Sequence, residues 1–103
     1  MTFVSVALVN DVPAGAAAQV VVNGQQIGLF NCAGTIYATD NICTHAYAEL
    51  HEGTIDADDC SIECPLHGAR FDLASGRALS LPAIMPVQVY EVRIEGEEIL
   101  IAV

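Results

Sequence analysis

Tight turns between short apolar runs are the feature that most constrains the fold of this chain. Asn23-Gly24 separates Val20–Val22 from Ile27–Phe30, and Asn-Gly between two such runs is a strong cue for a two-residue β-hairpin. Cys32-Ala33-Gly34 separates the second run from Ile36–Ala38 and predicts another hairpin. Apolar runs this short suit strands better than helices. The pattern predicts an all-β fold with antiparallel sheets.

The C-terminal half repeats this organisation. Residues 90–95 alternate apolar and charged side chains, which predicts one half-buried strand, and Gly96-Glu97 then turns the chain into Ile99–Val103. A shorter pair, Thr54–Asp56 and Ser61–Glu63, flanks an acidic tip. Helical signals are limited to single turns near Ala14–Ala18 and Ala46–His51. With 103 residues, the chain is predicted to form one domain, 1–103, as a small sandwich or barrel.

Charge and composition exclude several classes of function. The formal net charge is −10, with three arginines and no lysine, so nucleic acid and anionic membranes would repel this surface. No apolar run reaches the roughly 18–20 residues of a membrane helix. The N-terminal residues carry no basic flank, so no leader is expected and the protein is predicted to be cytoplasmic. Cysteines there stay reduced or bind metal, so a Cys32–Cys60 disulfide is not expected.

Two cysteine–histidine pairs carry the chemistry of the chain. They are Cys43-Thr44-His45 and Cys64-Pro65-Leu66-His67, separated by residues 46–63. Two thiolates and two imidazoles can bind zinc, or they can bind a [2Fe–2S] cluster with sulfur ligands on one iron and nitrogen ligands on the other. The residues by themselves leave both sites open.

The amino-acid sequence around these pairs resembles that of the Rieske family. The carriers of the resemblance are the Cys-x-His and Cys-x-x-His pairs, with Gly68, Phe71-Asp72, Ser75-Gly76-Arg77, Leu81-Pro82-Ala83, Ile36-Tyr37-Ala38 and Asp40. They cover residues 25–103. The resemblance implies an antiparallel Rieske fold with a cluster-binding subdomain at residues 41–69. It also implies one [2Fe–2S] cluster held by Cys43, His45, Cys64 and His67.

Departures from the pattern point to a branch of the family. High-potential members carry an extra cysteine in each loop and a serine and a tyrosine after the second loop. The corresponding positions here are Ala48, Leu66, Ala69 and Phe71, so neither the disulfide nor these hydrogen bonds to the cluster can form. Hydrogen bonds to cluster sulfur favour the reduced state, so the expected potential is near the low end of the Rieske range, about −150 mV.

The soluble Rieske ferredoxins fit this description. The resemblance implies a one-electron carrier. The sequence shows no nucleophile–base pair, phosphate loop or substrate-pocket motif, so no catalytic site is expected, and a monomer is the plain expectation. Its electrons would come from an NAD(P)H-dependent flavoprotein reductase and pass to a terminal Rieske non-haem iron oxygenase that hydroxylates aromatic rings. The alternatives are a structural zinc module, a small subunit of an assimilatory nitrite reductase, and a detached high-potential Rieske domain.

Other features outside the ligand pairs are interpreted as follows. Cys32 is expected to be a buried thiol and Cys60 a strand or turn cysteine. His51 is expected on the surface. The resemblance implies that residues 82–86 form a third loop over the cluster, which Pro82 would stiffen. Acidic residues gather around the loops: Glu49, Glu52, Asp56, Asp58, Asp59 and Glu63. They form either a solvated face or a field that steers basic partners.

Overall fold

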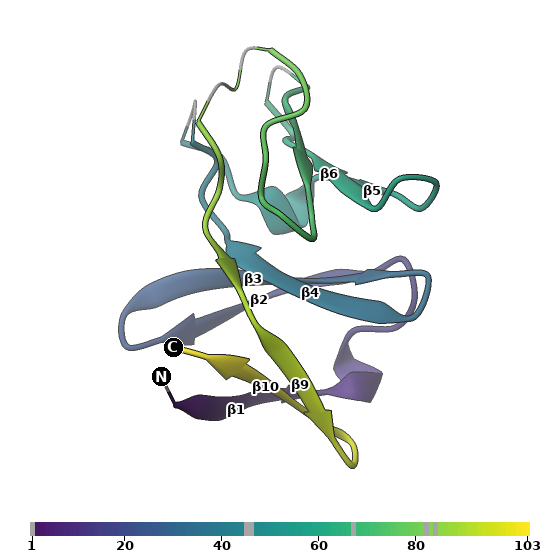
Figure 1. The fold of residues 1–103 in the computed structure, drawn as a ribbon, viewed down its shortest axis with the longest axis vertical. Coiled ribbons are helices and arrows are strands. Elements are labelled where there is room, and N and C mark those ends of the chain that lie inside the picture. The colour runs from purple at the N-terminus through teal and green to yellow at the C-terminus, as the bar shows by residue number, and fades with distance from the viewer. Residues whose placement is uncertain (1, 45–46, 67, 82, 84) are drawn as a thin grey trace.

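The computed structural model consists of three antiparallel sheets and describes residues 2–44, 47–66, 68–81, 83 and 85–103 (Figure 1). The first sheet has the order β1 (Phe3–Leu8), β10 (Glu98–Ala102), β9 (Val92–Glu95). The second has the order β2 (Ala17–Val22), β3 (Gln25–Cys32), β4 (Thr35–Asp40), β8 (Val89–Tyr90). The third has the order β5 (Thr54–Asp56), β6 (Ser61–Glu63), β7 (Arg70–Asp72). The 3₁₀ turns are η1 (Val9–Asp11) and η2 (Leu50–Glu52).

The predicted hairpins of the second sheet are confirmed. Asn23 and Gly24 have φ angles of 53° and 78°, the left-handed pair that a tight hairpin turn needs, and Val22 pairs with Gln25 across it. Ala33 and Gly34 join β3 to β4 in the same way. These turns fix the registers of the central sheet.

β3 separates two hydrophobic cores. Ile27 and Leu29 belong to a basal core shared with the sheet that holds both chain ends. Phe30 and Cys32 belong to a second core, which also contains Cys43 and Cys64. Because successive residues of a strand face opposite ways, one strand serves both cores.

The strand predicted over residues 90–95 is interrupted, which corrects that expectation. β8 ends at Tyr90 and pairs with β4, whereas β9 begins at Val92 and pairs with β10. The chain leaves one sheet for the next at Glu91, a change of partner that an alternating pattern cannot show. Of the helical turn predicted at 46–51, Leu50–Glu52 forms η2, while residue 46 lies outside the described residues.

The third sheet lies at the end of the longest axis opposite both termini (Figure 1). It follows the first cysteine–histidine pair and brackets the second. Within the described ranges, no helix is long and apolar enough to cross a membrane.

Candidate metal centre

Two loops of similar construction carry the predicted cysteine ligands. In the first, the Cys43 N–H donates to the Ala48 carbonyl at 2.9 Å; in the second, the Cys64 N–H donates to the Ala69 carbonyl at 2.6 Å. Ile42 forms an isolated antiparallel bridge with Glu49 just outside the first loop. Both loops are therefore closed at their necks by backbone hydrogen bonds, which hold each cysteine at the edge of a loop.

The structure brings Cys43 and Cys64 together in the second core, the one that also contains Phe30 and Cys32. Their exposed fractions are 4% and 1%, and both remain thiols. Burial, helped by the neighbouring Cys43 thiol and opposed by a hydrogen bond from the Leu66 N–H, raises the pKa of the Cys64 thiol to about 11. His45 and His67 lie outside the described residues.

This donor set fits thiolate ligation of iron. The raised pKa means that the Cys64 thiol does not ionise unaided near neutral pH, so a bound cation has to displace its proton. The Leu66 N–H already points at sulfur and would stabilise a thiolate. Two adjacent buried sulfurs with a backbone donor are what one iron of a mixed-ligand cluster requires.

A third segment lies against the first loop. The Thr44 hydroxyl donates to the Met85 carbonyl at 2.8 Å, and Ala83 and Val87 are buried in the same core as the two cysteines. This agrees with the third loop predicted at 82–86, although Pro82 and residue 84 lie outside the described residues.

Asn41 is a site residue that the sequence reasoning missed. It is fully buried at the neck of the first loop, two residues before Cys43. Its side chain donates to Gln19 Oε1 at 2.6 Å and to His51 Nδ1 at 2.8 Å, and accepts the His51 N–H at 2.9 Å. His51, expected on the surface, is therefore half-buried and tied to the loop. An asparagine between a strand and a ligand pair was the available signal.

Gly53 brings the two loops close together. A Cβ atom at this position would lie 1.9 Å from the Glu63 carbonyl oxygen, so only glycine permits the approach. Glu63 immediately precedes Cys64, and Gly53 immediately follows η2. The backbone contact therefore fixes the segment after the first loop against the strand that enters the second.

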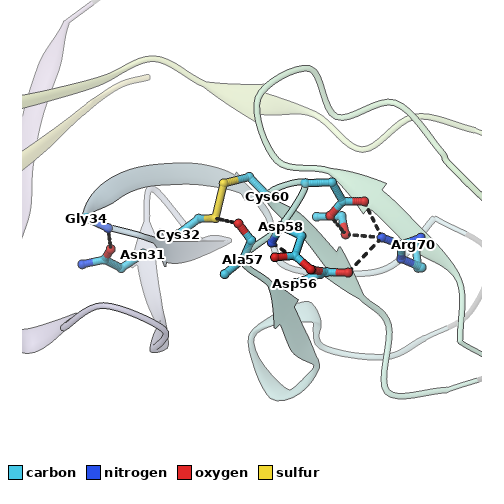
Figure 2. The surroundings of a disulfide bond; sticks show 10 residues. Asn31, Cys32, Gly34, Asp56, Ala57, Asp58, Cys60 and Arg70 are labelled. Carbon is cyan, nitrogen blue, oxygen red and sulfur yellow. Dashed lines mark hydrogen bonds and ion pairs between the residues drawn. A yellow bond between two sulfur atoms is a disulfide. The ribbon is translucent and has the colours of Figure 1, made fainter.

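A disulfide joins Cys32 to Cys60, which shows that the expectation of two separate thiols was wrong (Figure 2). Their Cα atoms are 5.7 Å apart although 28 residues separate them in the sequence. The expectation rested on the compartment, and only the tertiary structure shows that β3 ends beside the β5–β6 turn. The predicted burial of Cys32 and the turn position of Cys60 are both confirmed.

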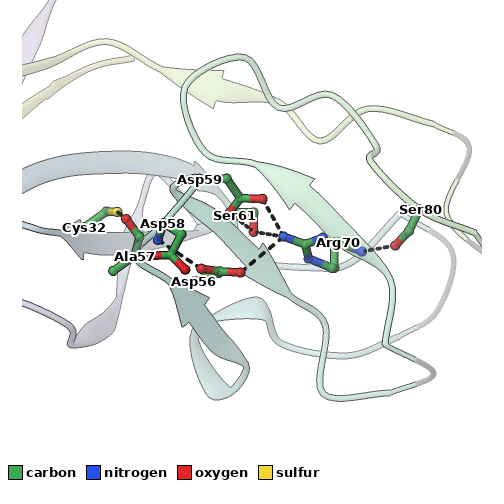
Figure 3. A network of polar contacts seen from close by, with 8 residues as sticks. All are labelled: Cys32, Asp56, Ala57, Asp58, Asp59, Ser61, Arg70 and Ser80. Carbon is green, nitrogen blue, oxygen red and sulfur yellow. Dashed lines mark hydrogen bonds and ion pairs between the residues drawn. The ribbon is translucent and has the colours of Figure 1, made fainter.

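Part of the acidic cluster is paired within the third sheet (Figure 3). Arg70 lies 2.6 Å from Asp59 and 3.5 Å from Asp56, and it donates to the Ser61 hydroxyl at 2.7 Å. The hydrogen bond from Ser61, followed by Arg70, lowers the pKa of the Asp59 carboxyl. The charge of this tip is therefore partly neutralised from within.

Exposed apolar side chains lie around the two loops. Tyr47 is 83% exposed, and Leu66, Leu81 and Met85 are also exposed. A shallow cavity of about 290 Å³ lies between the loops and is lined by Tyr47, Ala48, Glu49, Glu52, Pro65 and Leu66. Exposed apolar groups of this kind mark contact surfaces.

Comparison with known proteins identifies the family. The model of the Rieske [2Fe-2S] domain matches residues 2–91. The chain belongs to the Rieske [2Fe–2S] family. The predicted antiparallel Rieske fold is confirmed, and this Rieske chain carries one [2Fe–2S] cluster as its cofactor. This family membership excludes the alternative that the chain is a structural zinc module.

Several relatives of this Rieske chain are described as ferredoxins. It is 42% identical to the ferredoxin component of a naphthalene 1,2-dioxygenase system of Pseudomonas aeruginosa, covering 88% of this chain and 86% of that protein. It is 44% identical to a 3-phenylpropionate/cinnamic acid dioxygenase ferredoxin subunit of Shigella boydii, covering 90% and 86%. These relatives are electron-carrying components rather than catalytic subunits, as predicted for this chain.

Solved structures of ferredoxins have the same fold as this chain. The ferredoxin of carbazole 1,9a-dioxygenase from Nocardioides aromaticivorans superposes with a TM-score of 0.93 and 37% identity, covering 99% of this chain and 98% of that one. A putative nitrite reductase small subunit superposes with a TM-score of 0.85 at 20% identity, covering 100% of both chains. At that identity the likeness shows the fold alone, so the nitrite reductase alternative is the weaker one.

Proposed function

We propose that Cys43, His45, Cys64 and His67 hold the cluster, with both cysteines on one iron and both histidines on the other. The observation that carries this assignment is the meeting of two buried thiols from separate loops, beside the Leu66 N–H. When bound, the cluster accepts and releases one electron. The proposed sulfur ligands are almost fully buried in a core that they share with Ala83 and Val87, which favours a site shielded from water.

Substitution of each histidine in turn tests the assignment. His45→Ala and His67→Ala should abolish the visible and electron-paramagnetic-resonance spectra of the cluster, because each removes a ligand. His51→Asn is the matched control: His51 is the remaining histidine of the chain and lies outside both pairs, and an amide oxygen can still accept the hydrogen bond from the Asn41 side chain. Wild-type spectra in either ligand variant would overturn the assignment.

The chain is proposed to deliver electrons to the terminal Rieske oxygenase of an aromatic-ring-hydroxylating system. Its relatives are named as ferredoxins of such systems, and a solved complex of an oxygenase with its ferredoxin in carbazole 1,9a-dioxygenase matches this chain with 34% identity and a TM-score of 0.88, covering 97% of this chain and 92% of that one. An NAD(P)H-dependent flavoprotein reductase is the proposed donor. A monomer in the cytoplasm suits a shuttle between two partners.

The contact surface proposed for these partners is the exposed apolar rim of the loops, Tyr47, Leu66, Leu81 and Met85. Glu49 and Glu52 flank it, and the net charge of −10 favours partners with a basic docking face. The potential is proposed to lie near −150 mV, the low end of the Rieske range, because the buried Ala69 and Phe71 side chains cannot donate hydrogen bonds.

Rapid mixing of the reduced protein with an oxidised aromatic-ring oxygenase tests the transfer. Electron transfer should slow steeply as salt is added, because screening removes the attraction. Tyr47→Ser should slow transfer without changing the cluster spectrum, whereas Val21→Ser, an exposed apolar position on β2, is the control. A rate of electron transfer that changed neither with added salt nor in Tyr47→Ser would contradict the proposed surface.

A further inference from the structure

The Cys32–Cys60 disulfide connects two parts of the fold that are otherwise separate sheets. Cys32 is the last residue of β3, in the four-stranded sheet, and Cys60 is the last turn residue before β6, in the three-stranded sheet (Figure 2). The bond therefore fastens the β5–β6 turn to the base of the molecule.

Most hydrogen bonds of that turn run within its own sheet, whereas the Cys32 sulfur of β3 lies 3.9 Å from the Ala57 carbonyl oxygen of the turn, a weak contact between the two sheets (Figure 2). The Asp58 N–H donates to Asp56 Oδ1 at 2.9 Å, and the Leu73 N–H donates to the Cys60 carbonyl at 3.0 Å. Arg70 pairs with Asp59 at 2.6 Å. The contacts within the sheet would preserve the turn after the disulfide opened. The remaining attachment to β3 would be the weak Cys32–Ala57 contact and the apolar core that β3 shares with β6 and β7.

The disulfide lies close in sequence to a proposed cluster ligand. β6 begins at Ser61, directly after Cys60, and ends at Glu63, directly before Cys64. Cys60 has a φ of 51°, a left-handed conformation that a non-glycine residue adopts only when its surroundings enforce it. Opening the bond removes one such constraint at the start of the strand that delivers Cys64.

We propose that Cys32 and Cys60 form a second redox centre, a two-electron dithiol/disulfide couple whose opening loosens the hold of the second loop on the cluster. The reductant is a dithiol. Its thiolate attacks a sulfur of the bond, the half-buried Cys60 being more accessible than Cys32, which is 2% exposed. A mixed disulfide forms between the reductant and one cysteine, and the other cysteine is released as a thiol. The second thiol of the reductant then attacks the mixed disulfide and releases the remaining cysteine.

The electrons and protons of this exchange balance. Two electrons pass from the dithiol to the Cys32–Cys60 bond, two protons finish on the released thiols, and the reductant becomes a disulfide. The one-electron cluster takes no part in the step. In a reducing compartment, disulfides are usually transient and redox-sensing, which suits a bond of this kind.

Alkylation of the holo-protein in glutathione mixtures of graded ratio tests the couple directly. Cleavage after Glu63 separates Cys60 from Cys64, and cleavage after Asp40 separates Cys32 from Cys43, so mass spectrometry reads each cysteine by itself. Cys32 and Cys60 should pass together from protected to alkylated as the mixture becomes reducing. Equal alkylation in every mixture would overturn the proposal.

Bleaching of the visible cluster absorbance tests the consequence, which rests on the proposed ligand role of Cys64. Bleaching should be roughly fivefold faster in the reducing mixture than in the oxidising one. Cys60→Ser and Cys32→Ala should bleach at the fast rate in both mixtures, which also controls for direct effects of glutathione on the cluster. Equal rates for the wild-type protein in both mixtures would refute the loosening.

These readouts separate the two proposals. If Cys64→Ser kept the cluster spectrum, the ligand assignment would fail, while alkylation of Cys32 and Cys60 would still decide the thiol couple. If neither disulfide variant folded, alkylation and bleaching of the wild-type protein would decide the inference on their own.

Discussion

Gly53→Ala is expected to be among the most damaging single-methyl additions in the chain. The added Cβ would lie 1.9 Å from the Glu63 carbonyl oxygen and 3.2 Å from the Leu50 carbonyl oxygen. An ordinary contact needs about 3.4 Å, so the two backbone segments would have to separate by about 1.5 Å. Overpacking in a close-packed interior costs about 1–3 kcal/mol, and rigid backbone on both sides places this change at the upper end.

A cost of about 3 kcal/mol lowers the folded-to-unfolded ratio by roughly 150-fold. Because loss of the cluster makes unfolding irreversible, the measurement is the rate of bleaching of the visible absorbance at fixed temperature, compared with the wild-type holo-protein. Bleaching should accelerate by about 100-fold, or no holo-protein should be recovered.

Gly96→Ala provides the control. Gly96 has a φ of +62° but open space around its Cβ position, so alanine there costs only the left-handed conformation, about 1 kcal/mol. Gly53 has a φ of −84°, which any residue adopts, so a purely conformational account predicts that alanine stabilises the protein there. A neutral or stabilising Gly53→Ala would refute the steric argument.

Three further perturbations follow from the site. Asn41→Leu keeps the side-chain volume but leaves the His51 N–H without its acceptor, so unfolding should become easier by about 1–3 kcal/mol, measured as faster bleaching; bleaching at the wild-type rate would contradict this. Phe71→Tyr should raise the midpoint potential in a redox titration if the new hydroxyl reaches a ligand sulfur, and an unchanged potential would leave the hydrogen-bond account unsupported. Arg70→Met should lower thermal stability slightly and by a constant amount between about pH 5 and 9, because the lowered pKa of Asp59 keeps its carboxylate charged there; the difference should shrink as the pH falls below about 4, and a difference that grew in acid would have the wrong sign.

Local sequence patterns determined the elements of the fold. The Asn23-Gly24 turn could be predicted because it requires left-handed backbone angles that few residue pairs adopt readily. The two cysteine–histidine pairs could be singled out as candidate metal ligands because each places a thiolate and an imidazole two or three positions apart, although this spacing alone left zinc and a [2Fe–2S] cluster both open. In each case the feature depends on a few neighbouring residues, so a short segment of the sequence is enough to predict it.

Contacts between distant segments were decided by the tertiary structure. The change of sheets at Glu91 depends on which strand edges are vacant, and the alternation of 90–95 is the same on either side of it. Asn41 gained its role because Gln19 and His51 converge on it from other segments. No local pattern records such convergence.

The sequence by itself therefore determined where the chain turns and which side chains offer sulfur and nitrogen atoms to a metal, since side-chain chemistry and backbone preference are local properties. The tertiary structure decided that Cys43 and Cys64 share one buried core and that Cys32 meets Cys60 across 28 residues. Burial, the raised thiol pKa and the disulfide all depend on distances between segments far apart in the chain, and those distances are set by packing around β3.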